Sequence, residues 1–72
     1  MNNDAKIARR AIAIAKALWV PGEPSHHFAH LGEGVEQACL ENGIDPTPPS
    51  ESFQRIYDLA FAATAAAEIE RN

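Results

Sequence analysis

DAKIARRAIAIAKALW, residues 4–19, is the stretch that decides the fold. Its apolar side chains recur every three or four residues, at Ile7, Ala11, Ile14 and Leu18. At 100° per residue these positions fall within an arc of about 60°, which predicts a helix with one buried face. Lys6, Arg10 and Lys16 fall on the far side of the same helix. The pattern therefore predicts an amphipathic helix whose outer face is basic.

Residues 20–24, VPGEP, end this helix because proline cannot continue the backbone hydrogen-bond ladder. A second helix is expected to open near Ser25. Its inner face is formed by Phe28, Leu31, Val35, Ala38 and Cys39. Gly32 and Gly34 each weaken a helix by roughly 1 kcal/mol relative to alanine, so we expect its first half to be irregular. The end at Asn42-Gly43-Ile44 suits a left-handed glycine cap with a following apolar contact.

A third helix is expected after the proline-bearing segment 46–49, with Thr47 or Ser50 as its N-cap. Its inner stripe is formed by Phe53, Ile56, Tyr57, Ala60, Thr64 and Ala67. Leu59 and Phe61 flank that stripe on opposite sides. They widen the apolar arc to about 200°, which is more than a helix facing one core requires.

Length and composition limit what such a fold can contain. The chain has 72 residues, 46% of them apolar, and many of these are alanines that bury little area. The patterns together predict an all-α, compact three-helix domain over residues 1–72, with helices near residues 4–19, 27–42 and 49–70. A core this small favours further stabilisation by a partner subunit or a target.

Charge is unevenly distributed along the chain. The net charge is −4, but residues 1–20 carry four basic residues against one acidic residue, a net charge of +3. Residues 21–72 carry two basic residues against nine carboxylates, a net charge of −7. An acidic body excludes general nucleic-acid binding, since phosphates would be repelled by most of its surface. The basic first helix is the place where an anionic partner could dock.

That basic face consists of Lys6, Arg9, Arg10 and Lys16. Three interpretations are open. The side chains are solvated, or they contact acidic residues of the same domain such as Glu36 or Glu41, or they bind an acidic protein surface or a phosphate. The last interpretation makes these residues partner-binding.

The histidines form the cluster whose residue types are most typical of a metal site. His26 and His30 are four residues apart, so on a helix both rings share a face, and Glu33 lies one turn further along. Two imidazoles and a carboxylate at that spacing could hold zinc or nickel. The alternative is a solvated helix start whose histidines titrate near neutral pH. His27 stands where the metalloprotease HExxH motif has glutamate, so that motif is absent.

The sequence contains no pattern of catalytic residues. Cys39 falls on the apolar stripe of the second helix, where a thiol is expected to be buried and inert. Ser25, Ser50 and Ser52 lie at helix starts, where hydroxyls serve as caps. No glycine-rich phosphate loop follows a strand. We therefore expect no enzymatic activity and no cofactor.

Cys39 is the only cysteine, so no internal disulfide can form and a reducing cytoplasm is the expected location. No segment approaches the roughly 20 apolar residues that span a bilayer, and none has the pattern of a signal peptide. The expected partners are therefore neither membrane nor nucleic acid.

Two aromatic residues, Trp19 and Phe61, are ambiguous. Trp19 is either a lid on the core or an exposed binding anchor, and Phe61 carries the same two interpretations. We expect both to join the basic helix in binding a larger protein or complex.

The expected function is that of a small protein-binding regulator or inhibitor. By analogy of type, this resembles virus- and phage-encoded factors that bind host machinery such as RNA polymerase or a defence complex. The alternatives are a self-associating assembly protein, in which the wide apolar arc closes a homodimer, and a small histidine-based metal-binding module.

Overall fold

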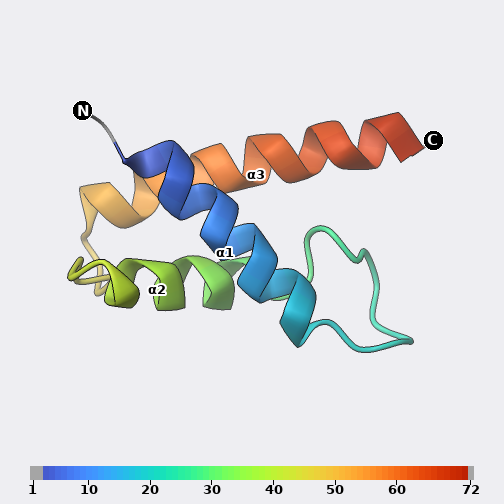
Figure 1. Ribbon diagram of the computed structural model, residues 1–72, viewed down its shortest axis with the longest axis horizontal. Coiled ribbons are helices and arrows are strands. Elements are labelled where there is room, and N and C mark those ends of the chain that lie inside the picture. The colour runs from blue at the N-terminus through green and yellow to red at the C-terminus, as the bar shows by residue number, and fades with distance from the viewer. Residues whose placement is uncertain (1–2, 72) are drawn as a thin grey trace.

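The computed structural model describes residues 3–71, with side chains described for residues 3–67. The chain folds into three helices, α1 (Asp4–Leu18), α2 (Leu31–Glu41) and α3 (Glu51–Arg71). Helix α1 runs diagonally across α2 and α3, and all three helices contact one another (Figure 1). No strand occurs between residues 3 and 71. The predicted all-α three-helix architecture is confirmed.

The core lies where the three helices meet. It consists of Ile7, Ala8, Ala11, Ile14, Ala15, Leu31, Val35, Ala38, Cys39, Ile56 and Ala60. The buried residues of α1 include the predicted positions Ile7, Ala11 and Ile14. Many core residues are alanines, which let helix backbones approach closely because they add little volume between them.

Gly34 is a point of such close approach. A Cβ atom at Gly34 would collide with the backbone carbonyl oxygen of Ala11 and lie 3.1 Å from the amide nitrogen of Ala15. Gly32, two residues earlier in α2, has open space around the same position. Gly34 is therefore where α1 packs against α2, whereas the sequence had marked it only as a weak helix former.

The start of α2 differs from the prediction. The helix begins at Leu31, and residues 26–30 form turns instead of the predicted first helical turns. Ser25 and His30 have positive φ angles of 45° and 63°. A left-handed residue cannot be part of a right-handed helix, so α2 starts only after His30. Within the turn, Ser25 Oγ accepts a hydrogen bond of 3.2 Å from the Phe28 amide.

The end of α2 is confirmed as a glycine cap. Gly43 has a φ of 72°. The Ile44 amide donates to the Cys39 carbonyl at 2.9 Å, and the Gly43 amide donates to the Leu40 carbonyl at 3.2 Å. These two bonds form a Schellman motif. Ile44 packs against the core, which is the predicted apolar contact.

Helix α3 begins after the prolines, and Ser50 is the cap. Ser50 Oγ accepts a hydrogen bond of 3.2 Å from the Phe53 amide, which is the N-cap geometry. Thr47, the other candidate, donates its amide to Asp45 Oδ1 at 2.9 Å and lies outside the helix. Near its start, α3 is joined to α1 by Arg55, whose Nε donates to the buried carboxylate of Asp4 at 3.0 Å.

Candidate partner-binding surface

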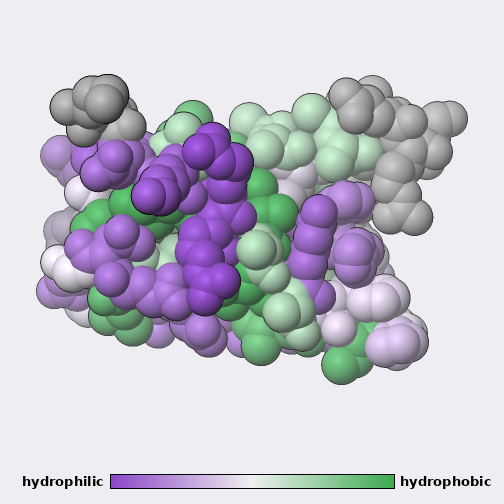
Figure 2. Space-filling view, in the orientation of Figure 1, coloured by the Kyte–Doolittle hydropathy of each residue, from purple (hydrophilic) through white to green (hydrophobic). Residues whose placement is uncertain are grey.

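The outer face of α1 carries the four basic residues predicted to bind a partner. Lys6, Arg9, Arg10 and Lys16 are all exposed. Figure 2 shows a hydrophilic band along α1 across the front of the molecule, with hydrophobic surface beside it. The structure assigns different surroundings to the four side chains.

Arg10 is exposed but is paired within the molecule. Its Nε donates to Glu41 Oε1 at 2.9 Å, and its Nη2 donates to Glu41 Oε2 at 3.0 Å. This two-pronged pair raises the pKa of Arg10 and lowers the pKa of Glu41, chiefly through the hydrogen bonds. For Arg10 the interpretation of an internal contact is confirmed, with Glu41 as the acidic residue. Glu36, the other candidate, forms no ion pair with the described side chains.

The remaining cations of α1 are available to a partner. Lys6, Arg9 and Lys16 form no ion pair with side chains of residues 3–67. Lys6 lies beside Arg10 in a shallow hollow that Asn42 closes on the side of α2. Arg9 and Lys16 are seven residues apart, which places them two turns apart along one side of the helix. That side faces α3.

An apolar groove runs between α1 and α3 on this side. It has a volume of about 340 Å³ and is lined by Ala5, Ala8, Arg9, Ile12, Leu59 and Ala63. The groove exists because three of these positions are alanines, whose small side chains leave space between the helices. Leu59 is 44% exposed, which is high for a leucine. Arg9 supplies the charge at the rim.

Leu59 also lines a second hollow at the end of the groove. This hollow has a volume of about 380 Å³, and its other lining residues are Asp4, Arg55 and Asp58. The combined surface is therefore apolar along most of its length, with Arg9 on one edge and mixed charges at one end. An elongated ligand with an apolar face fits these features better than a small polar molecule.

Phe61 lies on the other side of α3 from Leu59. It is 48% exposed. Its ring centroid lies 5.2 Å from that of Phe28 and 6.3 Å from that of Tyr57. The wide apolar arc of the third helix thus packs on two sides, because Leu59 faces α1 and Phe61 contacts the loop before α2.

Trp19 packs on this same loop. It is half-buried and is not among the residues that form or contact the buried core. Its Nε1 donates to the Glu23 carbonyl at 3.2 Å, and its ring meets His26 edge-on with 4.8 Å between centroids. Neither Trp19 nor Phe61 lines the groove. The structure therefore does not unite the six predicted binding residues in one patch.

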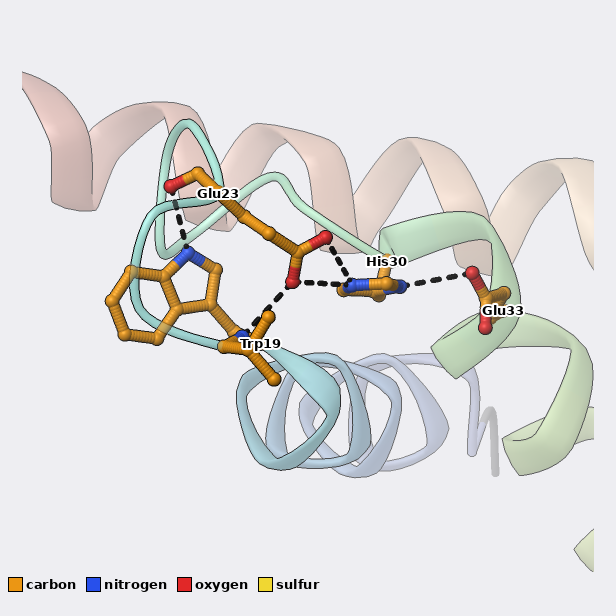
Figure 3. A network of polar contacts seen from close by, with 5 residues as sticks. Trp19, Glu23, His30 and Glu33 are labelled. Carbon is orange, nitrogen blue, oxygen red and sulfur yellow. Dashed lines mark hydrogen bonds and ion pairs between the residues drawn. The ribbon is translucent and has the colours of Figure 1, made fainter.

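The His26–His30 pair, which was the alternative metal-binding interpretation, is not brought together. His26 faces Trp19, whereas the His30 ring lies between the carboxylates of Glu23 and Glu33 (Figure 3). That alternative required both histidines on one helix face, but residues 26–30 form turns and the left-handed His30 ends them before α2. Among the described residues, no group of three or more histidine, cysteine, aspartate or glutamate side chains is placed to hold a metal ion.

Cys39 is buried in the core with no exposed surface. Burial raises the pKa of its thiol, so the thiolate is disfavoured at neutral pH. The predicted burial of this residue is confirmed.

Ile12 and Glu23 were not singled out from the sequence, and Leu59 was noted only as part of the wide apolar arc of the third helix. Ile12 and Leu59 line the groove, and Glu23 contacts His30. Leu59 had a signal, because it lies off the inner stripe of its helix. No sequence pattern indicated Glu23, since its position in a loop between two prolines does not predict which side chain its carboxylate contacts.

Comparison of the chain with protein-family models, curated proteins and solved structures found no match. None of the described helices is long and apolar enough to cross a membrane.

Proposed function

We propose that this chain is a small protein-binding module that acts as a regulator or inhibitor of a larger protein or complex. The observation that carries the proposal is the open apolar groove between α1 and α3 with Arg9 on its rim. Exposed apolar surface bordered by charge is typical of protein–protein binding sites. A reducing cytoplasm is the proposed location, because the only cysteine is a buried free thiol.

The proposed ligand is an acidic amphipathic helix of another protein. Its apolar side chains would lie on Ile12 and Leu59, and its carboxylates would meet Arg9 and Lys16. Charge complementarity supports this ligand, because residues 1–20 are the positive part of an otherwise acidic chain. Arginine can bind a carboxylate through two parallel hydrogen bonds, which adds geometric specificity. Helix-in-groove binding relies on apolar anchors of this kind.

Affinity capture with single-site variants tests the proposal. Leu59→Glu places a charge in the groove. Leu40→Glu is its control, because Leu40 is a leucine on α2 that is 60% exposed, against 44% for Leu59, and does not line the groove. A specific partner should be captured from the native host by the wild type and by Leu40→Glu, and lost with Leu59→Glu. Thermal unfolding of each variant checks that the fold is intact.

A purified partner then tests the role of charge. Arg9→Glu should slow association and weaken its dependence on salt, whereas Arg10→Glu should have less effect because Arg10 is already paired with Glu41. A partner that binds Leu59→Glu and Leu40→Glu equally well would contradict the proposal. Capture of nucleic acid by the same cations would show that the ligand is a phosphate backbone instead.

A further inference from the structure

The loop between α1 and α2 contains a histidine whose two ring nitrogens both face carboxylates. His30 Nδ1 lies 2.9 Å from Glu33 Oε1. His30 Nε2 lies 2.8 Å from Glu23 Oε1 and 2.9 Å from Glu23 Oε2. Glu23 belongs to the loop and Glu33 to the first turn of α2, so the ring bridges two parts of the chain (Figure 3).

Protonation of the ring decides whether both contacts are attractive. A neutral imidazole carries one N–H donor and one acceptor nitrogen, whereas an imidazolium donates from both nitrogens. Ionised carboxylates only accept hydrogen bonds. In neutral His30, one nitrogen lone pair would therefore face a carboxylate oxygen. With both carboxylates ionised, both contacts are attractive only when the ring is charged.

Glu23 extends this network to the end of α1. Its Oε1 accepts a hydrogen bond of 2.9 Å from the Val20 amide. Its backbone carbonyl accepts the bond from Trp19 Nε1. One residue thus joins the end of α1, the loop and, through His30, the start of α2.

The backbone of this loop is held in a conformation that it does not favour by itself. Ser25 and His30 are both left-handed, with φ angles of 45° and 63°. Such a conformation costs a non-glycine residue free energy, so side-chain contacts must maintain it. The network around His30 supplies contacts of this kind at the residue that directly precedes α2.

We propose that residues 19–30 form a proton-dependent clamp, which is closed while His30 is an imidazolium between Glu23 and Glu33 and is released when His30 loses its proton. This inference concerns a different part of the surface from the groove and does not depend on the proposed function. Release would loosen the contacts of Trp19 and of Phe28, which covers part of Phe61.

The pKa shifts define the pH range over which the clamp is closed. Hydrogen bonds to Glu33 and then to Glu23 raise the pKa of His30 above its ordinary 6.5. Protonated His30 therefore makes its full contribution to the free energy of unfolding below pH 6.5. That contribution is lost as pH rises through the raised pKa of His30. Hydrogen bonds from His30 and Val20 lower the pKa of Glu23 below its ordinary 4.5, so the contact is lost again in strong acid.

Other charged groups near the ring do not change this scheme. Glu23 of the loop and Glu33 of α2 are the residues whose charges act on His30. Within the described side chains, α1 and α3 contribute no ion pair or hydrogen bond to the ring. His26 and His27 lie in the same loop, so a variant is needed to separate their effects from that of His30.

NMR titration of the whole chain between pH 5 and 9 tests the clamp. At pH 6 both ring nitrogens of His30 should carry protons, and the His30 midpoint should lie above 6.5. The Val20 amide and Trp19 indole signals should shift with that same midpoint. The protection of the Val20 amide against hydrogen exchange, corrected for the intrinsic effect of pH, should fall above it.

Three variants separate the clamp from the other histidines. His30→Asn should abolish the pH-dependent shift of the Val20 amide signal. Asparagine is chosen because it tolerates the left-handed conformation that His30 has. Glu33→Gln keeps His30 and Glu23 in place and should move the His30 and Val20 midpoints together to lower pH. His27→Asn is the control and should leave the Val20 midpoint unchanged, because the His27 ring contacts the ring of His26.

Either of two results would overturn the proposal. One is a His30 midpoint in the wild type at or below 6.5. The other is a pH-dependent shift of the Val20 amide signal that persists unchanged in His30→Asn. If His30→Asn does not fold, Glu33→Gln decides, since an unshifted Val20 midpoint in that variant contradicts the clamp.

Discussion

Replacement of Gly34 by alanine adds one methyl group at the crossing of α1 and α2. The new Cβ would collide with the Ala11 carbonyl oxygen and lie 3.1 Å from the Ala15 nitrogen. Both are backbone atoms of a helix, so no side-chain rotation can relieve the contact and α1 must move as a unit. Gly32→Ala adds the same methyl group two residues away, where nothing lies within 4 Å. It is the matched control.

The magnitude follows from two opposing terms. Glycine to alanine within a helix gains up to about 1 kcal/mol for either variant. Overpacking a close-packed interior costs roughly 1–3 kcal/mol, and the upper end applies at Gly34 because backbone atoms must yield. Gly34→Ala should therefore lower the free energy of unfolding by about 2 kcal/mol, whereas Gly32→Ala should raise it by up to about 1 kcal/mol. In a domain of this size, about 2 kcal/mol corresponds to a fall in Tm of roughly 8–16 °C.

Urea and thermal unfolding followed by far-UV circular dichroism measure both variants against the wild type. The expected order of stability is Gly32→Ala, wild type and then Gly34→Ala. A Gly34→Ala protein as stable as Gly32→Ala would refute the reasoning, because it would mean that the α1 backbone does not lie against this residue.

Two other features of the structure give further predictions. The wild type should be monomeric by light scattering at high concentration, and Phe61→Glu should lower Tm through loss of the Phe28 contact, an aromatic pair worth about 0.5–1.5 kcal/mol. A concentration-dependent dimer that Phe61→Glu dissociates would instead support the self-associating assembly protein. Cys39 should react with a thiol reagent only after the chain unfolds, because its side chain is fully buried and burial raises its pKa. Rapid labelling of the native protein would contradict that burial.

The sequence alone determined the features that depend on neighbours a few residues apart. The apolar spacing of residues 4–18 predicted α1 because helix periodicity repeats within a turn. Gly43 predicted the end of α2 because few residues other than glycine readily adopt its left-handed conformation. Ser50 was one of two candidate caps for α3, since capping involves an amide only three residues later.

Only the tertiary structure decided the features that join distant parts of the chain. Arg10 and Glu41 are 31 residues apart, so their pairing, and hence the loss of Arg10 as a free cation, depends on how α1 crosses α2. The groove depends on the gap that alanines leave between Leu59 and α1. The start of α2 depends on His30, whose left-handed backbone is supported by Glu23 across seven residues. Such contacts are set by the packing of whole helices, which no local pattern of residues specifies.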